Sequence, residues 1–211
     1  MKKKLIVAIS MLASFIVWTL LVRFIDVKAI GPSSSSVGFA TLNGFVHNLT
    51  ETNLLLYKIT DWLGLVPIFV ALCFAVLGFV QLIKRKSLLK VDYDILALGI
   101  FYIAVMAVYV LFEYVVINYR PILIDGYLEA SYPSSTTMLV LCVMPTALMQ
   151  LITRIKCVVF KRFVAVAIFA FTVFMVVGRI LSGVHWITDI VGGVLISAGL
   201  VTLYRYFTEK H

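Results

Sequence analysis

Charged residues are scarce in this 211-residue chain, and Asp, Glu, Lys and Arg together make up only 13% of it. Hydrophobic residues make up 63%, and the mean hydropathy is +1.09. A soluble domain carries roughly twice this share of charge. The composition therefore excludes a soluble domain and indicates an integral membrane protein. The net charge of +8 comes mostly from short cation clusters between hydrophobic runs, so we interpret it as a topology signal and expect no nucleic-acid partner.

Cysteine is also scarce. The three cysteines, Cys73, Cys142 and Cys157, lie in or beside apolar segments and have no paired spacing. This arrangement does not match a disulfide framework or a set of metal ligands. We expect all three to act as packing residues, with no disulfide and no metal site.

Long hydrophobic runs, in contrast, are abundant. Several reach the roughly 20 residues that cross a bilayer as a helix, and they are continuous rather than alternating, which argues against a β-barrel. The run after Lys2 is long for a signal peptide and no clean cleavage site follows it, so we interpret it as the first span. The predicted fold class is an all-α integral membrane protein: a single domain over residues 1–211, with a six-transmembrane helix bundle at about residues 5–22, 63–83, 95–117, 134–152, 164–181 and 190–206.

The positions of the cations predict how the bundle is oriented. Lysine and arginine clusters precede the first span and follow the second, fourth and sixth, which places both termini in the cytoplasm. We expect a multi-pass protein of the plasma membrane. The outer segment 23–62 contains two stretches, about 45–49 and 54–62, that are suited to an interfacial amphipathic helix. That helix would be either a lid beside the lipid entrance or plain surface packing.

With this topology, polar residues from four spans fall at the outer face. Arg120 ends the third span, the residues from Ser134 to Thr136 begin the fourth, Arg179 is late in the fifth, and His185 with Asp189 begins the sixth. Polar groups are costly beside lipid and usually face a cavity or a partner. A shared functional site is the simplest reason for this common depth, and the alternative is a polar cluster that only pins helices together.

The spacing of His185 and Asp189 favours a reactive histidine. If the sixth helix already includes His185, the two side chains lie one turn apart and within reach of each other. A carboxylate in this position keeps one imidazole nitrogen protonated and leaves the other as a free lone pair. Arg179 adds a planar guanidinium that suits phosphate or carboxylate.

Together these residues make the chain resemble the membrane branch of the type 2 phosphatidic acid phosphatase superfamily. That family carries three motifs: lysine, six residues and Arg-Pro; Pro-Ser-Gly-His; and Ser-Arg, five residues, histidine, three residues and aspartate. The third motif is matched by Gly178-Arg179, His185 and Asp189, with glycine in place of serine. In the first motif Arg120-Pro121 is kept but Glu113 replaces lysine, and in the second Pro133-Ser134-Ser135 is followed by Thr136 instead of histidine.

The resemblance implies a metal-independent lipid phosphatase without a cofactor, whose active site faces the exterior or periplasm. His185 would attack phosphorus to form a phosphohistidine, and Asp189 would orient it. The phosphoryl oxygens would be held by Arg120, Arg179, Ser134 and Ser135, with help from the amino-terminal end of the fourth helix.

The two departures affect the predicted chemistry. Thr136 removes the family's general acid, a loss that commonly costs about 10²–10⁴ in rate. This favours a substrate with a good leaving group, such as undecaprenyl pyrophosphate, or else an inactive member that binds or translocates a phosphorylated lipid. Glu113 would form an ion pair with an arginine, repel phosphate, or act as a substitute acid. A phosphotransferase is a third possibility, and the sequence identifies no protein partner.

Overall fold

The computed structural model describes residues 2–209, and Met1, Lys210 and His211 lie outside this range. Within it, all named elements are helices, and three isolated β-bridges occur in the loops. The elements in chain order are α1 (Lys2–Phe24), η1 (Pro32–Ser34), α2 (Ala40–Thr50), α3 (Leu54–Leu63), α4 (Leu65–Arg85), η2 (Leu88–Lys90), α5 (Tyr93–Tyr114), α6 (Ser135–Arg154), α7 (Val158–Leu181) and α8 (Ile187–Thr208).

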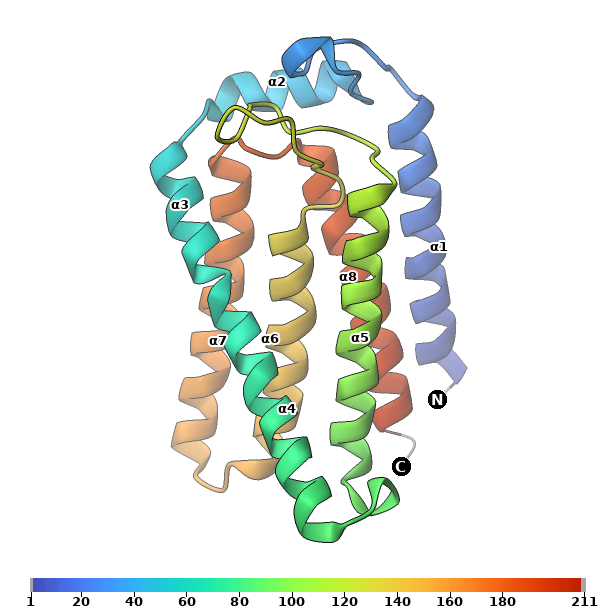
Figure 1. Cartoon of the computed structure of the whole chain (residues 1–211), viewed down its shortest axis with the longest axis vertical. Helices are drawn as coiled ribbons and strands as arrows, with labels where there is room; N and C mark the ends of the chain where they lie inside the picture. Colours follow the sequence, from blue (N-terminus) through green and yellow to red (C-terminus); the bar gives the residue numbers. More distant parts are fainter. Residues whose placement is uncertain (1, 210–211) are drawn as a thin grey trace.

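Six helical segments of the described chain are long and apolar enough to cross a membrane, with α3 and α4 counted as one. The prediction of an all-α, six-span fold is therefore confirmed. The spans run side by side, and both ends of the chain lie at the same end of the bundle (Figure 1). The short helix α2 lies across the opposite end, which we call the outer end, and the end that carries the termini is the inner end.

The centre of the bundle is formed by α6 and α8. In an apolar 18-residue stretch of each of these two helices half of the residues are buried, compared with 11–22% in the corresponding stretches of the other spans. The peripheral helices present large apolar side chains outward, as expected for contact with lipid, for example Ile6, Phe69, Phe79, Ile103, Phe163 and Phe169. Small residues let α8 approach its neighbours: a Cβ atom on Gly192 would lie 2.6 Å from the Tyr132 ring. The outer half of α8 therefore packs directly against the segment that leads into α6.

The second predicted span corresponds to two helices in the structure. We expected a span at 63–83 preceded by a separate interfacial helix near 54–62, and the structure has α3 (Leu54–Leu63) followed by α4 (Leu65–Arg85), which by length and composition count as one candidate span. The interfacial position of α3 stays a prediction. Gly64 joins the two helices with helical torsion angles (φ −60°, ψ −19°), so the chain continues with little interruption. The α3 part packs against α7 at a close contact, where a Cβ on Gly178 would lie 2.7 Å from Thr60 Cγ2. This contact brings α3 to the polar residues of the outer end.

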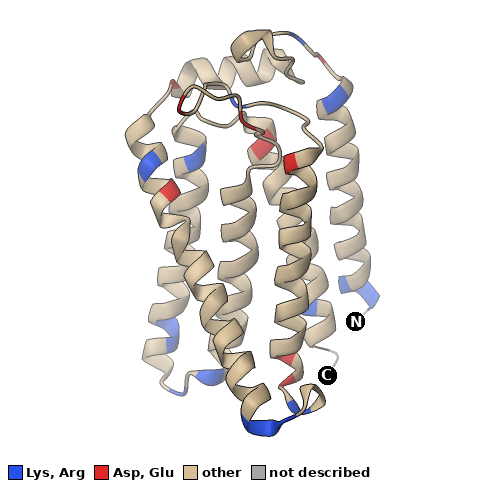
Figure 2. Ribbon diagram, viewed as in Figure 1, with Lys and Arg blue, Asp and Glu red and all other residues tan. Residues whose placement is uncertain are grey.

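Charged residues are unevenly distributed along the bundle. Figure 2 shows lysine and arginine gathered at the inner end, where the clusters at 84–86, 154–156 and 161–162 lie in the helix ends and connections. This is the pattern of a cation-rich cytoplasmic side. The cytoplasmic position of the termini remains a prediction from this charge pattern.

Candidate active site

His185 lies in the turn between α7 and α8, at the outer end of the bundle. Its side chain is buried, with 5% of the residue exposed. Arg120 Nη1 lies 3.4 Å from His185 Nε2, and the Ser131 hydroxyl oxygen lies 3.0 Å from Nδ1. Both ring nitrogens therefore face side chains from the segment between α5 and α6.

The relation between His185 and Asp189 differs from the expected one. We predicted direct contact, but the Ser131 hydroxyl lies between them and donates a 2.5 Å hydrogen bond to Asp189 Oδ2. The prediction required His185 to belong to the helix, whereas α8 begins at Ile187 with Trp186 as its N-cap. The spacing rule for residues one helical turn apart therefore does not apply to this pair.

Asp189 is completely buried and its carboxylate is held by three donors. Besides Ser131, the side-chain amide of Asn118 donates to Oδ1 at 3.0 Å, and the backbone N–H of Trp186 donates to Oδ2 at 3.1 Å. Neither Asn118 nor Ser131 was predicted from the sequence. The available signal was weak: each is a polar residue two or three positions before a predicted site residue, at the same outer depth.

Arg179, in the last turn of α7, is 1% exposed and only partly satisfied. Its Nη2 donates to Asp61 Oδ1 at 3.0 Å and also to the Thr136 hydroxyl. Its Nε and Nη1 are buried and have no hydrogen-bond partner within residues 2–209. Unpaired buried donors on a cation are costly, and a planar guanidinium with free donors is suited to bind a phosphoryl or carboxylate group.

Tyr57 of α3 brings the two arginines of the site together. The Cζ atoms of Arg120 and Arg179 lie 5.8 Å and 5.1 Å from the centre of its ring, within the range of cation–π attraction. Each arginine also has a carboxylate partner at the site's margin: Glu129 Oε2 lies 3.0 Å from Arg120 Nε, and Asp61 contacts Arg179. Sequence analysis missed Tyr57, Asp61 and Glu129, although the one-turn spacing of Tyr57 and Asp61 in an amphipathic stretch was a usable signal.

The three residues at the start of α6 have different roles. Ser134 is fully buried and uses both of its donors within the protein, its N–H to the Asp189 carbonyl at 3.0 Å and its hydroxyl to Thr137 Oγ1 at 3.0 Å. Both donors of Ser134 thus have protein partners, and its contact with phosphate stays a prediction. Ser135, the first residue of the helix, is only partly buried and lines a small pocket. Thr136 accepts a hydrogen bond from Arg179.

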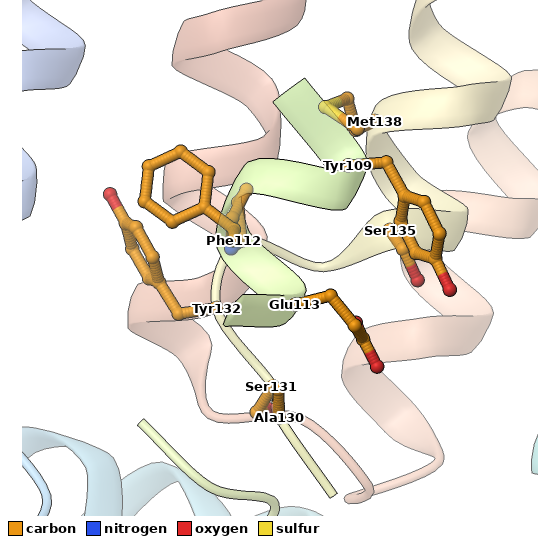
Figure 3. Close-up of a pocket in the computed structure, with 9 residues that line it drawn as sticks. Tyr109, Phe112, Glu113, Ala130, Ser131, Tyr132, Ser135 and Met138 are labelled. Atoms are coloured by element: carbon orange, nitrogen blue, oxygen red, sulfur yellow. The ribbon is translucent and has the colours of Figure 1, made fainter. Parts of the chain in front are cut away.

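The pocket has a volume of about 20 Å³ and lies beside Ser131. Figure 3 shows Tyr109, Glu113 and Ser135 on one side of it and Phe112 with Tyr132 on the other. Glu113 is exposed, and the described part of the chain offers it no ion pair, so the expected pairing with an arginine is not found. Glu129, not Glu113, pairs with Arg120.

The protonation state of His185 follows from its surroundings. Burial lowers its pKa well below the usual 6.5, the nearby Arg120 and Arg179 lower it further, and a hydrogen bond to the Ser131 backbone acts in the opposite direction. The ring is therefore neutral near pH 7 and keeps a lone pair.

Sequence analysis predicted no metal site and no disulfide. Residues 2–209 contain no group of three or more His, Cys, Asp or Glu side chains placed to hold a metal ion, and the three cysteines are free.

Buried arginines, a neutral histidine and the amino-terminal end of α6 meet at one end of the bundle, so this helical membrane protein carries a group of donors that is suited to an anion. A family model described as the PAP2 superfamily matches residues 97–211. This match covers more than half of the chain, which belongs to the PAP2 superfamily, as its motifs predicted.

A solved structure supports the fold over nearly the whole chain. It is described as the crystal structure of the first transmembrane PAP2 type phosphatidylglycerolphosphate phosphatase from Bacillus subtilis. The TM-score is 0.67 at 18% sequence identity, and the alignment covers 97% of this chain and 96% of that one. At this identity the likeness shows the fold alone. No curated protein sequence matches the chain.

Proposed function

We propose that the protein is a lipid phosphatase or pyrophosphatase that acts through a phosphohistidine on His185 at the outer face of the plasma membrane. The observation that carries the proposal is the position of His185 Nε2, 3.4 Å from Arg120 Nη1, next to a second buried arginine with two unused donors. Family membership and a structural neighbour described as a lipid phosphatase support the same reaction class.

The proposed reaction has two displacements at phosphorus. In the first, the Nε2 lone pair of His185 forms a bond to the terminal phosphorus and the bond to the lipid-bearing oxygen breaks, taking its electron pair with the leaving group. In the second, water attacks the phosphohistidine, the N–P bond breaks, and inorganic phosphate leaves with the water proton released to solvent. Arg120, Arg179 and the α6 amino-terminal end stabilise the charge on the phosphoryl oxygens.

The absence of a histidine at position 136 determines which substrate we propose. The Thr136 hydroxyl is a far weaker acid than an imidazolium, and it already accepts a hydrogen bond from Arg179. An alkoxide leaving group would therefore depart slowly. A lipid pyrophosphate such as undecaprenyl pyrophosphate expels a phosphate, which needs little protonation, and we propose this substrate class.

The test is a phosphate-release panel with purified protein. We expect faster release from undecaprenyl pyrophosphate than from phosphatidic acid, and loss of release in His185→Ala. A control is Ser197→Ala, which removes a buried hydroxyl of α8 that donates to the Met138 carbonyl. Unchanged phosphate release in His185→Ala would exclude His185 as the nucleophile. Faster release from phosphatidic acid would exclude the proposed preference for substrates whose leaving group is a phosphate.

A second candidate is a non-catalytic member that binds or translocates a phosphorylated lipid. It is supported by the acidic residues around the arginines: Glu113 stands where the family has lysine, and Asp61 and Glu129 pair with the phosphate-binding groups. For this candidate, the wild-type protein would bind lipid phosphate without hydrolysis. The variant with both Thr136→His and Glu113→Lys would then gain turnover from none, whereas substantial wild-type turnover would exclude the candidate.

A further inference from the structure

Ser131 is placed so that its hydroxyl is shared between His185 and Asp189. A serine hydroxyl has one proton to donate, and an ionised carboxylate only accepts. Because the Ser131 oxygen lies 2.5 Å from Asp189 Oδ2, its proton is directed to the carboxylate. The 3.0 Å contact with His185 must then be a hydrogen bond donated by Nδ1–H to the Ser131 oxygen. This order of donors leaves the lone pair on Nε2, the nitrogen that faces Arg120.

The position of Ser131 is itself fixed by buried contacts. Its residue is 3% exposed, and its backbone N–H donates to the Asn118 carbonyl at 2.9 Å. The side chain of Asn118 in turn donates to Asp189 at 3.0 Å. Asn118 therefore contacts both the Ser131 backbone and the Asp189 carboxylate. These two contacts help to fix the distance between Ser131 and Asp189.

We propose that Ser131 is a positioning residue through which Asp189 orients His185, so that the orienting unit is a chain of histidine, serine and aspartate. This proposal rests on the proposed role of His185 as nucleophile. When Nε2 bonds to phosphorus, the ring becomes cationic and its Nδ1–H becomes a stronger donor. The Ser131 oxygen, polarised by the carboxylate behind it, stabilises that charge while the proton stays on Nδ1.

The first test reads the histidine tautomer and needs no turnover. The chain has three histidines, so the ¹⁵N signal that disappears in His185→Gln identifies the ring in a selectively labelled sample. We expect wild-type protein to show a protonated Nδ1 and an unprotonated Nε2 near neutral pH. In Ser131→Ala we expect a mixture of the two tautomers, and Ser197→Ala should keep the wild-type signal. A wild-type signal in Ser131→Ala would overturn the proposal, because the Ser131 backbone alone would then fix the ring.

The second test is a double-mutant cycle on release of phosphate from undecaprenyl pyrophosphate. We expect Ser131→Ala to lower kcat about tenfold or more with KM changed less than about threefold, since loss of an orienting partner affects mainly the reactive state. Asp189→Asn should then lower kcat little further in the Ser131→Ala background. If the two losses multiply instead, Asp189 acts on His185 by another route and the proposal fails.

The two tests separate this proposal from the proposed function. If the wild-type protein hydrolyses nothing but Ser131→Ala still changes the tautomer, His185 is not a nucleophile in these assays but the orienting chain exists. If hydrolysis requires His185 and the tautomer does not depend on Ser131, the proposed function stands and the orienting chain is wrong. Ser131→Thr keeps the hydroxyl, so it should show the wild-type tautomer with Nδ1 protonated. Its thermal stability, compared with that of Ser131→Ala, shows whether the added methyl group is accommodated.

Discussion

At the scale of single residues, the pH dependence of the reaction follows from the charges around His185. Its pKa is lowered by burial and by Arg120 and Arg179, and only the neutral ring is a nucleophile. We expect kcat/KM to be level above pH 6.5 and to fall only as the pH drops through the lowered pKa. Arg120→Gln removes one cation, so it should raise the pKa of His185 and move this acid limb to higher pH.

The measurement is the pH profile of kcat/KM for wild type and variant with one substrate, so that ionisation of the substrate cancels. Arg205→Gln is the control, because Arg205 is exposed and lies near the end of α8 remote from the site. An acid limb that stays in place in Arg120→Gln, or moves to lower pH, would contradict the assigned electrostatic cause.

Asp61 is a second residue for which the direction of the change in KM can be predicted. Its exposed carboxylate pairs with Arg179. In the proposed function, it would compete with the substrate phosphate for that guanidinium. An ion pair with an exposed partner is worth up to about 1 kcal/mol, so we expect Asp61→Asn, which keeps an oxygen acceptor, to lower KM by about two- to fivefold.

Lys58→Gln is the matched control for Asp61→Asn. Lys58 is exposed on the same helix, and within residues 2–209 no hydrogen bond or ion pair joins it to either arginine. Its substitution should therefore not lower KM. A higher KM in Asp61→Asn would mean that the carboxylate positions Arg179 rather than competing with substrate.

The sequence predicted those site residues whose spacing matches a motif. His185, Asp189, Arg120 and Arg179 were chosen in this way. Hydrogen bonds connect His185 to Arg120 and, through Ser131, to Asp189, and both arginines lie over the ring of Tyr57. Ser131 was missed because its role depends on a contact with residues more than fifty positions away, which local spacing does not encode. The contacts of Ser134 were not predicted either: its N–H donates to the Asp189 carbonyl of α8 and its hydroxyl to Thr137 of α6.

At the scale of helices, the glycine that replaces the family's serine in the third motif has a packing role. Gly178 faces α3, and a Cβ there would lie 2.7 Å from Thr60 Cγ2. Overpacking of this kind typically costs about 1–3 kcal/mol. We expect Gly178→Ala to push α3 outward, move Tyr57 away from the arginines, lower the melting temperature and raise KM.

Combining Gly178→Ala with Thr60→Ser tests this explanation. Thr60→Ser removes the obstructing methyl group and keeps the hydroxyl that donates to the Leu56 carbonyl. The double variant should recover most of the lost stability and affinity. Gly99→Ala, where a new Cβ meets nothing within 4 Å, should leave both unchanged or raise stability slightly. If Gly178→Ala behaves like Gly99→Ala, the contact does not position α3.

Hydropathy was sufficient to predict six spans, because the composition of each run determines whether it can face lipid. Polar residues such as Lys58 and Asp61 indicated a separate helix before the second span, and α3 and α4 are separate helices that meet at Gly64. The pairing of Asp61 with the buried Arg179 could not be predicted, because the two residues lie 118 positions apart in the chain.

At the scale of the whole molecule, the site and the termini lie at opposite ends of the bundle, which makes the orientation testable. Cys157 is exposed and precedes α7 at the inner end, whereas Cys142 is buried and Cys73 is exposed on the apolar helix α4. We expect a membrane-impermeant maleimide to label Cys157 only after cells are permeabilised.

Tyr127→Cys supplies the matching reporter for the outer end, since Tyr127 is 74% exposed in the loop before α6. This variant should be labelled in intact cells. Cys73→Ser should leave both results unchanged, because the reagent does not enter the hydrocarbon region. Labelling of Cys157 in intact cells, with Tyr127→Cys protected, would reverse the predicted orientation.

The two arginines of the site approach one ring, that of Tyr57, from different parts of the chain: Arg120 from the loop between α5 and α6, and Arg179 from the last turn of α7. A phosphate mimic bound by both guanidinium groups would therefore connect the loop before α6 to the end of α7, with α3 between them. Because such an anion binds only the assembled state, tight binding raises the melting temperature of the whole bundle. Vanadate or a similar oxyanion would then serve as a stabilising additive during purification, even for variants that turn over no substrate.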